Sequence, residues 1–229
     1  MGISRSRGVA RVATIRSDAG VMLVLLTALA VSAGNQLSAI ASPTNPAQGI
    51  TARVVVSHVD QSDAFTFAPD GRIFIAEHAS GHIDIFDPVS GVLSLFATVP
   101  NVFIDGDAGL MGIVLHPRYP TQPFVYVFAT RTVSGTPREQ ILRFTDTGGT
   151  GTSPRVIFTG NTVANGFHQG GRILFGPDGM LYAIDGDRDD PANAQNPSTD
   201  SGKVLRMTAL GRVPPDNPFP GSLVWTYGH

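Results

Sequence analysis

A histidine followed by two glycines, with two aspartates after the next predicted hairpin, is the part of the sequence best suited to chemistry. His168 precedes Gly170 and Gly171, and an Asp-Gly-Asp segment runs from Asp185 to Asp187. Imidazole titrates near neutral pH and can take a proton from an alcohol. Glycines beside it leave room for a flat ligand. We therefore predict that His168 is a general base and that Asp187 hydrogen-bonds its ring and fixes the tautomer.

Plainer interpretations of the same residues stay open. A lone histidine is more often structural than catalytic, and Asp185 and Asp187 could belong to a solvated turn. The acidic run 187–190 lacks the ligand spacing of a calcium loop, which again favours a solvated turn. The other histidines that we considered have no metal-ligand spacing, and we expect strand, loop or packing roles for them: His58, His78, His82 and His116.

The elements that must position His168 belong to a repeated pattern. An apolar strand, a turn with proline and a second apolar strand occur around Pro69, Pro117 and Pro177, separated by 48 and 60 residues. Periods near 50 residues with several short strands are typical of β-propeller blades. Alternating apolar residues predict further strands, because one face of such a strand is buried: 82–86, 141–144 and 203–207 as third strands and 92–96 as an outer strand.

This pattern predicts an all-β fold, a β-propeller of about three blades over residues 50–229. A fourth blade is expected to start at 223–226. Propellers close with four to eight blades, because an open ring leaves sheet edges and a blade face uncovered. We therefore expect the chain to be the N-terminal part of a longer protein. The alternative is a complete four-bladed ring that the N-terminal strand closes.

Composition limits the classes of function. The 229 residues are 42% hydrophobic and 15% charged, and 26 glycines with 17 prolines indicate many turns. A net charge of −2 gives no electrostatic reason to expect nucleic acid as a partner. The absence of cysteine excludes a disulfide framework, thiol catalysis and thiolate metal sites in this sequence.

The N-terminal residues are typical of an export signal. Four arginines precede an apolar run at 21–33, and 39–41 offers small residues for cleavage. The run is shorter than the roughly 20 residues of a membrane span. We predict a signal peptide at 1–41, a linker at 42–49 and a periplasmic or secreted mature protein outside the membrane. An uncleaved signal anchor is the alternative.

Several motifs also occur in one order across residues 65–229: Phe67-Ala68-Pro69-Asp70-Gly71 with Ala76-Glu77, 109–117, His168-x-Gly170-Gly171-Arg172, Gly186-Asp187, Ala194-Gln195, 202–206, 213–219 and 224–229. With these motifs the chain resembles the soluble aldose and sorbosone dehydrogenases, which use pyrroloquinoline quinone (PQQ) on a six-bladed propeller. The resemblance implies an enzyme that oxidises a sugar at the C1 hydroxyl and passes electrons to an external acceptor.

The resemblance also implies roles for residues. His168 would take the C1 hydroxyl proton while hydride passes to the quinone, with Asp187 supporting it. Gln195 and His78 would bind substrate, although many members have Glu-Arg or Glu-Gln where this chain has Glu77-His78. The expected cofactor-binding residues are His168, Gly170, Gly171 and His229.

Other features of the family pattern differ or fall outside the sequence. Phe167 stands where some glucose-oxidising members have Asp, and Gln169 replaces the commoner Asn. The Ca²⁺ ligands, and the Lys and Arg residues that hold the quinone carboxylates, would lie beyond His229. We therefore expect the chain alone to be inactive. Two other functions stay open: a non-catalytic propeller that recognises a protein, and a calcium-dependent lactonase.

Overall fold

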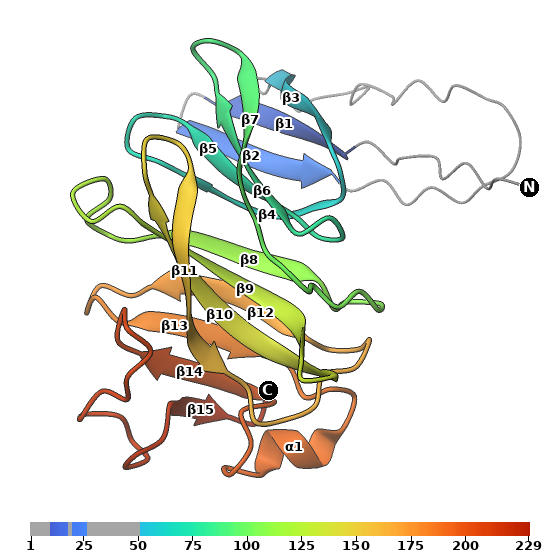
Figure 1. Cartoon of the computed structure of the whole chain (residues 1–229), viewed down its shortest axis with the longest axis vertical. Coiled ribbons are helices and arrows are strands. Elements are labelled where there is room, and N and C mark those ends of the chain that lie inside the picture. Colours follow the sequence, from blue (N-terminus) through green and yellow to red (C-terminus); the bar gives the residue numbers. More distant parts are fainter. Residues whose placement is uncertain (1–9, 18–19, 27–50) are drawn as a thin grey trace, which may run out of the picture. The chain divides into compact units, whose positions relative to one another are not determined.

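The computed structural model describes residues 10–17, 20–26 and 51–229, which divide into two compact units at Ser62 (Figure 1). In the first unit, β1 (Ala10–Ser17) pairs with both β2 (Gly20–Leu26) and β3 (Thr51–Val59) in an antiparallel sheet. The predicted signal peptide falls mostly, and the predicted linker wholly, outside the described residues, so both stay predictions. Within those residues, no helix is long and apolar enough to cross a bilayer.

Three four-stranded antiparallel sheets make up the second unit, each with its strands in chain order. The first consists of β4 (Ser62–Phe67), β5 (Ile73–Glu77), β6 (His82–Asp87) and β7 (Val92–Thr98). The second consists of β8 (Leu110–Leu115), β9 (Phe124–Val133), β10 (Thr136–Asp146) and β11 (Gly151–Thr159). The third consists of β12 (Gly170–Phe175), β13 (Leu181–Asp185), β14 (Lys203–Met207) and β15 (Val224–Tyr227).

The predicted repeat is confirmed, because each proline turn joins the first and second strands of a sheet. In the third sheet, Asp178 accepts a hydrogen bond from the amide of Met180 at 3.1 Å, and Gly179 takes the left-handed φ of +75°. The Asp70-Gly71 turn of the first sheet repeats this geometry, with φ +89° at Gly71. A type of turn that needs a glycine therefore closes both hairpins.

One part of the blade assignment was wrong. The segment at 223–226 does not begin a fourth sheet, because β15 pairs with β14 and completes the third. Val224 is buried in the same core as Leu205. The proline-rich connection from Thr208 to Leu223 is long for a link between hairpin strands, so β14 and β15 pair although they are far apart in the sequence.

The core lies in two layers, one on each side of the second sheet. On β9, Val125, Val127 and Ala129 belong to the cluster shared with the first sheet. The alternate residues Tyr126 and Phe128 belong to the cluster shared with the third. Successive side chains of a strand point to opposite faces, so a nearly continuous apolar run supplies both layers.

The inner strands of the second and third sheets approach closely at glycines. A Cβ atom on Gly112 of β8 would lie 2.1 Å from the carbonyl oxygen of Gly171 on β12, and one on Gly171 would lie 2.4 Å from Cβ of Met111. Larger residues would push these strands apart. This close approach lies at the start of β12, which begins two residues after His168.

Candidate functional site

The predicted site residues lie beside strand ends, at the same end of each sheet. In an antiparallel sheet, the first strand starts at the same end of the sheet at which the second strand finishes. His168 precedes β12 and Asp187 follows β13, so both lie at that end of the third sheet. Gln195 ends α1 (Pro191–Gln195) in the β13–β14 connection, and His229 follows β15. His78 follows β5, at the corresponding end of the first sheet.

His168 and Asp187 are paired. Nδ1 of His168 lies 2.8 Å from Oδ1 of Asp187, and the imidazole is 58% exposed while the carboxylate is 19% exposed. The hydrogen bond that Nδ1 of His168 donates to Asp187 raises the pKa of His168, and the same bond lowers the pKa of Asp187. Because the carboxylate occupies Nδ1, the other ring nitrogen, Nε2, has no partner among the described residues. A neutral ring held this way carries its proton on Nδ1 and can accept one at Nε2.

The backbone at His168 takes an uncommon conformation that its neighbours enforce. Its φ is +49°, and its amide donates to Oδ2 of Asp107 at 3.0 Å. A Cβ atom on Gly186 would lie only 1.9 Å from the carbonyl oxygen of His168, so glycine is required where the two turns cross. Positive φ is uncommon outside glycine, although histidine adopts it more often than most residues. The turns before β12 and after β13 are thus locked together at the histidine.

The chain itself packs against the two glycines after His168. A Cβ atom on Gly170 would lie 2.5 Å from the carbonyl oxygen of Ile184, and one on Gly171 would meet Met111. Both glycines have positive φ, +79° and +89°. This packing gives a structural reason for both residues, and their predicted contact with a cofactor stays a prediction.

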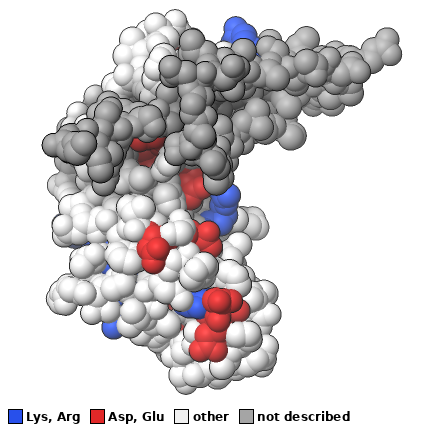
Figure 2. Space-filling model, turned by 90° about the vertical axis from the view of Figure 1, so that its right-hand side faces the viewer, with Lys and Arg blue, Asp and Glu red and all other residues white. Residues whose placement is uncertain are grey.

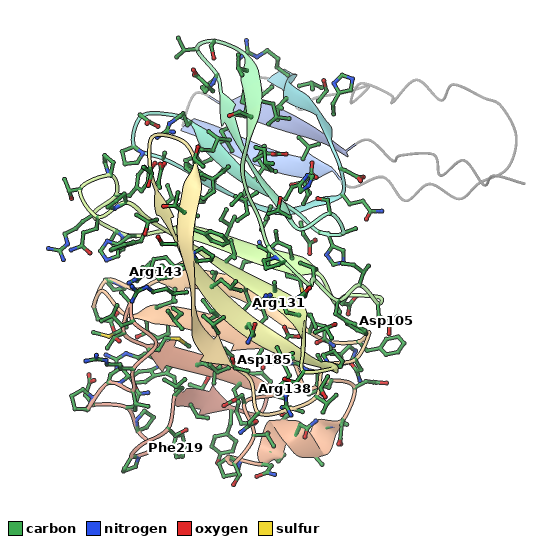
Figure 3. All side chains as sticks on the ribbon, viewed as in Figure 1. Asp105, Arg131, Arg138, Arg143, Asp185 and Phe219 are labelled. Atoms are coloured by element: carbon green, nitrogen blue, oxygen red, sulfur yellow. The ribbon has the colours of Figure 1, made fainter. Side chains whose placement is uncertain are left out.

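A buried cluster of charges beneath the pair was missed from the sequence. The side chain of Arg188 is 3% exposed, and its Nη2 lies 2.5 Å from Oδ1 of Asp185 and 3.5 Å from Oε1 of Glu139. Asp185 and Glu139 are themselves buried. The interpretation of 187–190 as a solvated turn is therefore wrong for Arg188, because its guanidinium turns inward to these carboxylates. Figure 3 labels Asp185, which ends β13.

The other Nη of Arg188 faces backbone. Nη1 donates to the carbonyl oxygens of His168 and Gln169, both at 3.3 Å, and of Gly186 at 3.2 Å. Burial raises the pKa of Glu139 to about 8, although Arg188 acts to lower it. Burial likewise raises the pKa of Asp185, against the pull of the guanidinium. One cation thus lies between two buried acids and three carbonyls.

Alternation along the strands could have indicated this cluster. Asp185 has the same phase in β13 as the buried Leu181 and Ala183, and Glu139 has the phase of the buried Ile141 in β10. A carboxylate at a core position needs a buried partner, and an arginine follows Asp185 three residues later.

Gln195 and His229 lie near each other at the end of the third sheet. Nε2 of Gln195 is 3.4 Å from the position of a Cβ on Gly228. The amide of His229 donates to the carbonyl oxygen of Gly202 at 3.2 Å, and its Nε2 lies 2.7 Å from the Thr226 hydroxyl. Neither residue contacts His168 among the interactions of the described residues. The structure therefore pairs His168 with Asp187. It places Gln195 and His229 at the same end of the third sheet without direct contact with His168.

A buried ammonium holds the short helix that carries Gln195. Nζ of Lys203 donates to the carbonyl oxygens of Asn193 at 2.7 Å, Ala194 at 3.3 Å and Ser201 at 2.6 Å. Asp190 caps the other end of α1 by accepting from the amide of Ala192 at 3.1 Å. A helix of five residues is not stable by itself, so these contacts account for its place.

His78 is held by its own sheet and by the loop before β8. Nδ1 of His78 lies 3.1 Å from Oδ2 of Asp63. A Cβ atom on Gly109 would lie 2.4 Å from the imidazole, so the ring packs against that glycine. The same loop carries Asp107, which binds the His168 amide. His116 packs against Phe124 and Phe175, with ring centroids 6.1 and 5.5 Å apart, which confirms its predicted packing role.

The surroundings of the site are acidic. The charged groups that raise the pKa of His168 are Asp187, Asp189 and Asp107. Figure 2 shows the side of the molecule that carries Asp105 in Figure 3, where red carboxylates gather in several places and blue groups are few. Within residues 10–17, 20–26 and 51–229, no group of three or more His, Asp or Glu side chains is arranged to hold a metal ion.

Comparison with known proteins places most of the chain in one family. Residues 59–229 match the glucose/sorbosone dehydrogenase family. Quinoprotein glucose dehydrogenase B of Acinetobacter calcoaceticus is 30% identical over 232 residues, which cover 84% of this chain and 48% of the relative. The PQQ-bound aldose sugar dehydrogenase of Streptomyces coelicolor superposes with a TM-score of 0.67 at 33% identity, covering 74% of this chain and 51% of that one.

The name of a third relative refers to an interaction and not to a dehydrogenase. Human hedgehog-interacting protein is 31% identical over 176 residues, which cover 67% of this chain and 25% of the relative. The chain therefore spans about half the length of the two dehydrogenases, and a quarter of this relative.

Proposed function

Because the chain belongs to the glucose/sorbosone dehydrogenase family, whose fold is a β-propeller, we propose that the whole protein oxidises aldose sugars at the C1 hydroxyl, with PQQ as cofactor. The observation that carries the proposal is the contact at 2.8 Å between Nδ1 of His168 and Oδ1 of Asp187, in which the imidazole is 58% exposed. A base of this kind is what removal of an alcohol proton requires.

The proposed mechanism begins with His168 in its neutral form. Nε2 accepts the proton of the sugar C1 hydroxyl, and Nδ1 keeps its proton directed at Asp187. The imidazolium that forms is stabilised by the adjacent carboxylate, which remains ionised because the pair lowers its pKa. PQQ, when bound, supplies the two-electron acceptor for the C1 hydride. Gln195 and His78 are proposed to bind the sugar.

The described residues fit this chemistry on the side of the base. An exposed imidazole with one free nitrogen suits a substrate that lies between it and a cofactor. The charges that act on His168 are all acidic, however, and Arg188 is directed inward. Among the described residues, no Lys or Arg is among the groups that shift the pKa of His168, although the exposed Arg172 directly follows Gly171 on β12. We propose His168, Gly170, Gly171 and His229 as its contacts, with basic residues and Ca²⁺ ligands supplied from outside this sequence.

The test is His168→Gln in the full-length protein, with His58→Gln as control. Loss of the base should lower sugar-dependent dye reduction by roughly two or more orders of magnitude, while equilibrium dialysis shows PQQ still bound. His58 is an exposed residue of β3, in the first unit, and is not among the proposed site residues, so its variant should keep full turnover. Unchanged turnover in His168→Gln would remove this residue from the mechanism.

The similarity to hedgehog-interacting protein supports a second candidate, a propeller that recognises a protein partner without oxidising sugar. The two candidates differ in one measurement. A recognition module gives no PQQ-dependent turnover with any aldose, whereas the enzyme gives turnover that depends on His168. Export to the periplasm or the medium is proposed with either function.

A further inference from the structure

We propose that Arg188 is a positioning residue for the pair of His168 and Asp187. Its guanidinium holds the carbonyls of His168 and Gly186 from beneath, and the imidazole and the carboxylate project from the same two turns. The catalytic meaning of this inference rests on the proposed function. The pairing itself can be measured without it.

The contacts of Arg188 cover both turns. Nη1 lies 3.3 Å from the carbonyl oxygens of His168 and Gln169, before β12, and 3.2 Å from that of Gly186, after β13. The backbone of Arg188 is fixed as well, with φ +66° and a hydrogen bond of 2.9 Å from Asn165 to its carbonyl oxygen. Arg188, which follows Asp187 in the chain, therefore binds the backbone of His168, the partner of Asp187.

The second Nη ties these turns to the neighbouring sheet. Nη2 contacts Asp185 on β13 and Glu139 on β10, so one planar group joins the site turns to two buried carboxylates. Guanidinium presents its donors in a fixed fork, whereas the lysine ammonium is a point charge on a flexible stem. A lysine could neutralise the carboxylates and would not reach both sets of acceptors at once.

Stability alone does not require such a cluster. Apolar residues of similar volume often replace a buried ion pair without loss of folding free energy. The cluster differs from a plain ion pair because half of the guanidinium binds backbone at the site. That half is what a positioning role needs and a purely neutralising role does not.

The two roles predict opposite shifts at His168. The groups that act on the imidazole by charge are Asp187 after β13, Asp189 in the same turn and Asp107 before β8. Removing a nearby positive charge would by itself raise the pKa of His168. Loosening the contact with Asp187 would lower it, because that hydrogen bond is the main cause of the raised pKa.

The experiment measures the pKa of His168 by NMR titration of its imidazole, in the full chain without PQQ. The signal is assigned with His168→Gln. A compensated variant combines Arg188→Met with Asp185→Asn and Glu139→Gln, so that no buried charge is left unpaired. Arg188→Lys keeps the cation without the fork. Arg212→Met, at an exposed arginine, is the matched control. Thermal unfolding establishes that each variant is folded.

We expect the pKa of His168 to fall in the compensated variant and in Arg188→Lys, toward the value in Asp187→Asn, and to stay unchanged in Arg212→Met. In the active full-length enzyme, kcat should fall by about a hundredfold, as displacement of a reacting group by roughly 1 Å can cause, with little change in KM. Arg188→Lys is the decisive variant, because it keeps the charges of the cluster, whereas the compensated variant also removes two carboxylates. A folded Arg188→Lys variant whose His168 titrates as in the parent, or higher, overturns the proposal. Absence of sugar oxidation in the parent enzyme contradicts the proposed function and leaves the NMR result standing.

Discussion

The carbonyl oxygen of His168 lies so close to Gly186 that a Cβ atom there would be 1.9 Å away. The two turns that carry the base and its carboxylate therefore touch through backbone, without room for any side chain. Their separation is set by this contact together with the guanidinium of Arg188.

Gly186→Ala should disrupt the site by moving these turns apart. We expect the free energy of unfolding to fall by about 2–3 kcal/mol, as for other severe steric changes, and the His168 signal to titrate at lower pH. The matched control is Gly160→Ala, where the added Cβ would be at an ordinary 3.5 Å from Glu139. Urea unfolding of both variants checks this, and equal stability of the two would contradict it.

Asp187→Asn should change the pH dependence of turnover in a definite direction. The base must be neutral, and the hydrogen bond to Asp187 raises its pKa, so the acidic limb of activity in the parent lies at a higher pH than for an unpaired histidine. Without the carboxylate this acidic limb of kcat/KM moves to lower pH, and the plateau falls by about a hundredfold or more.

The control for this profile is Asp189→Asn. Asp189 acts on the imidazole only through its charge, so its variant should show a smaller shift in the same direction and keep the plateau. An acidic limb that stays in place in Asp187→Asn would show that the observed pKa belongs to another group.

Glu139→Gln should make stability less dependent on pH. Burial raises the pKa of Glu139 to about 8 in the folded protein, above its ordinary value. The folded state therefore binds more protons than the unfolded state between these values, and the free energy of unfolding falls as pH rises through this range. The variant lacks this group, so it should lose less stability than the parent between about pH 5 and pH 9.

Unfolding in urea at several pH values measures this difference. Asp189→Asn, at an exposed carboxylate, should give a curve parallel to that of the parent. Glu139→Gln and parent curves that run parallel over the whole range would mean that Glu139 is ionised in both states.

Lys203 is the only lysine in the sequence, which makes it a reporter for α1. Its ammonium is buried and donates to three carbonyls, so amine reagents should modify only the amino terminus of the folded chain. Peptide mass spectrometry after brief labelling checks this. Labelling of Lys203 at the rate of a free amine, under conditions where the chain is folded, would contradict the buried position.

Lys203→Met should release the same helix. Hydrogen bonds to charged groups contribute about 1.5–3 kcal/mol each, and carbonyls left without a donor add to the loss. We expect the free energy of unfolding to fall by at least about 3 kcal/mol, with faster amide hydrogen exchange at residues 192–196 than in the parent. Exchange there at the parental rate would show that Asp190 and the chain alone hold α1.

Much of the fold could be predicted because its signals are local. Alternating apolar residues and the Asp-Gly turns at 70–71 and 178–179 each depend on a few neighbouring residues, and the structure has the expected strands there. The error at 223–226 arose from long-range pairing, because which sheet an outer strand joins depends on the whole connection before it.

The site was predicted where chemistry and sequence neighbourhood coincide, and missed where they do not. His168 and Asp187 flank one hairpin, so their contact follows from pairing of its strands. Glu139 reaches Arg188 from another sheet, and no spacing in the sequence brings these two together. Only the positions of Asp185 and Glu139 in the alternation of their strands predict that both are buried acids, which need a cationic partner.

Strand β9 contributes alternate side chains to two separate layers of the core. Inserting or deleting one residue near its middle would exchange the two sets beyond that point, so that Tyr126 and Phe128 would face the space shaped for valine and alanine. Both layers would then be damaged by a single event. In homologous chains we expect changes of length at the hairpin tips around this strand, at 121–122 and 134–135, and none within it.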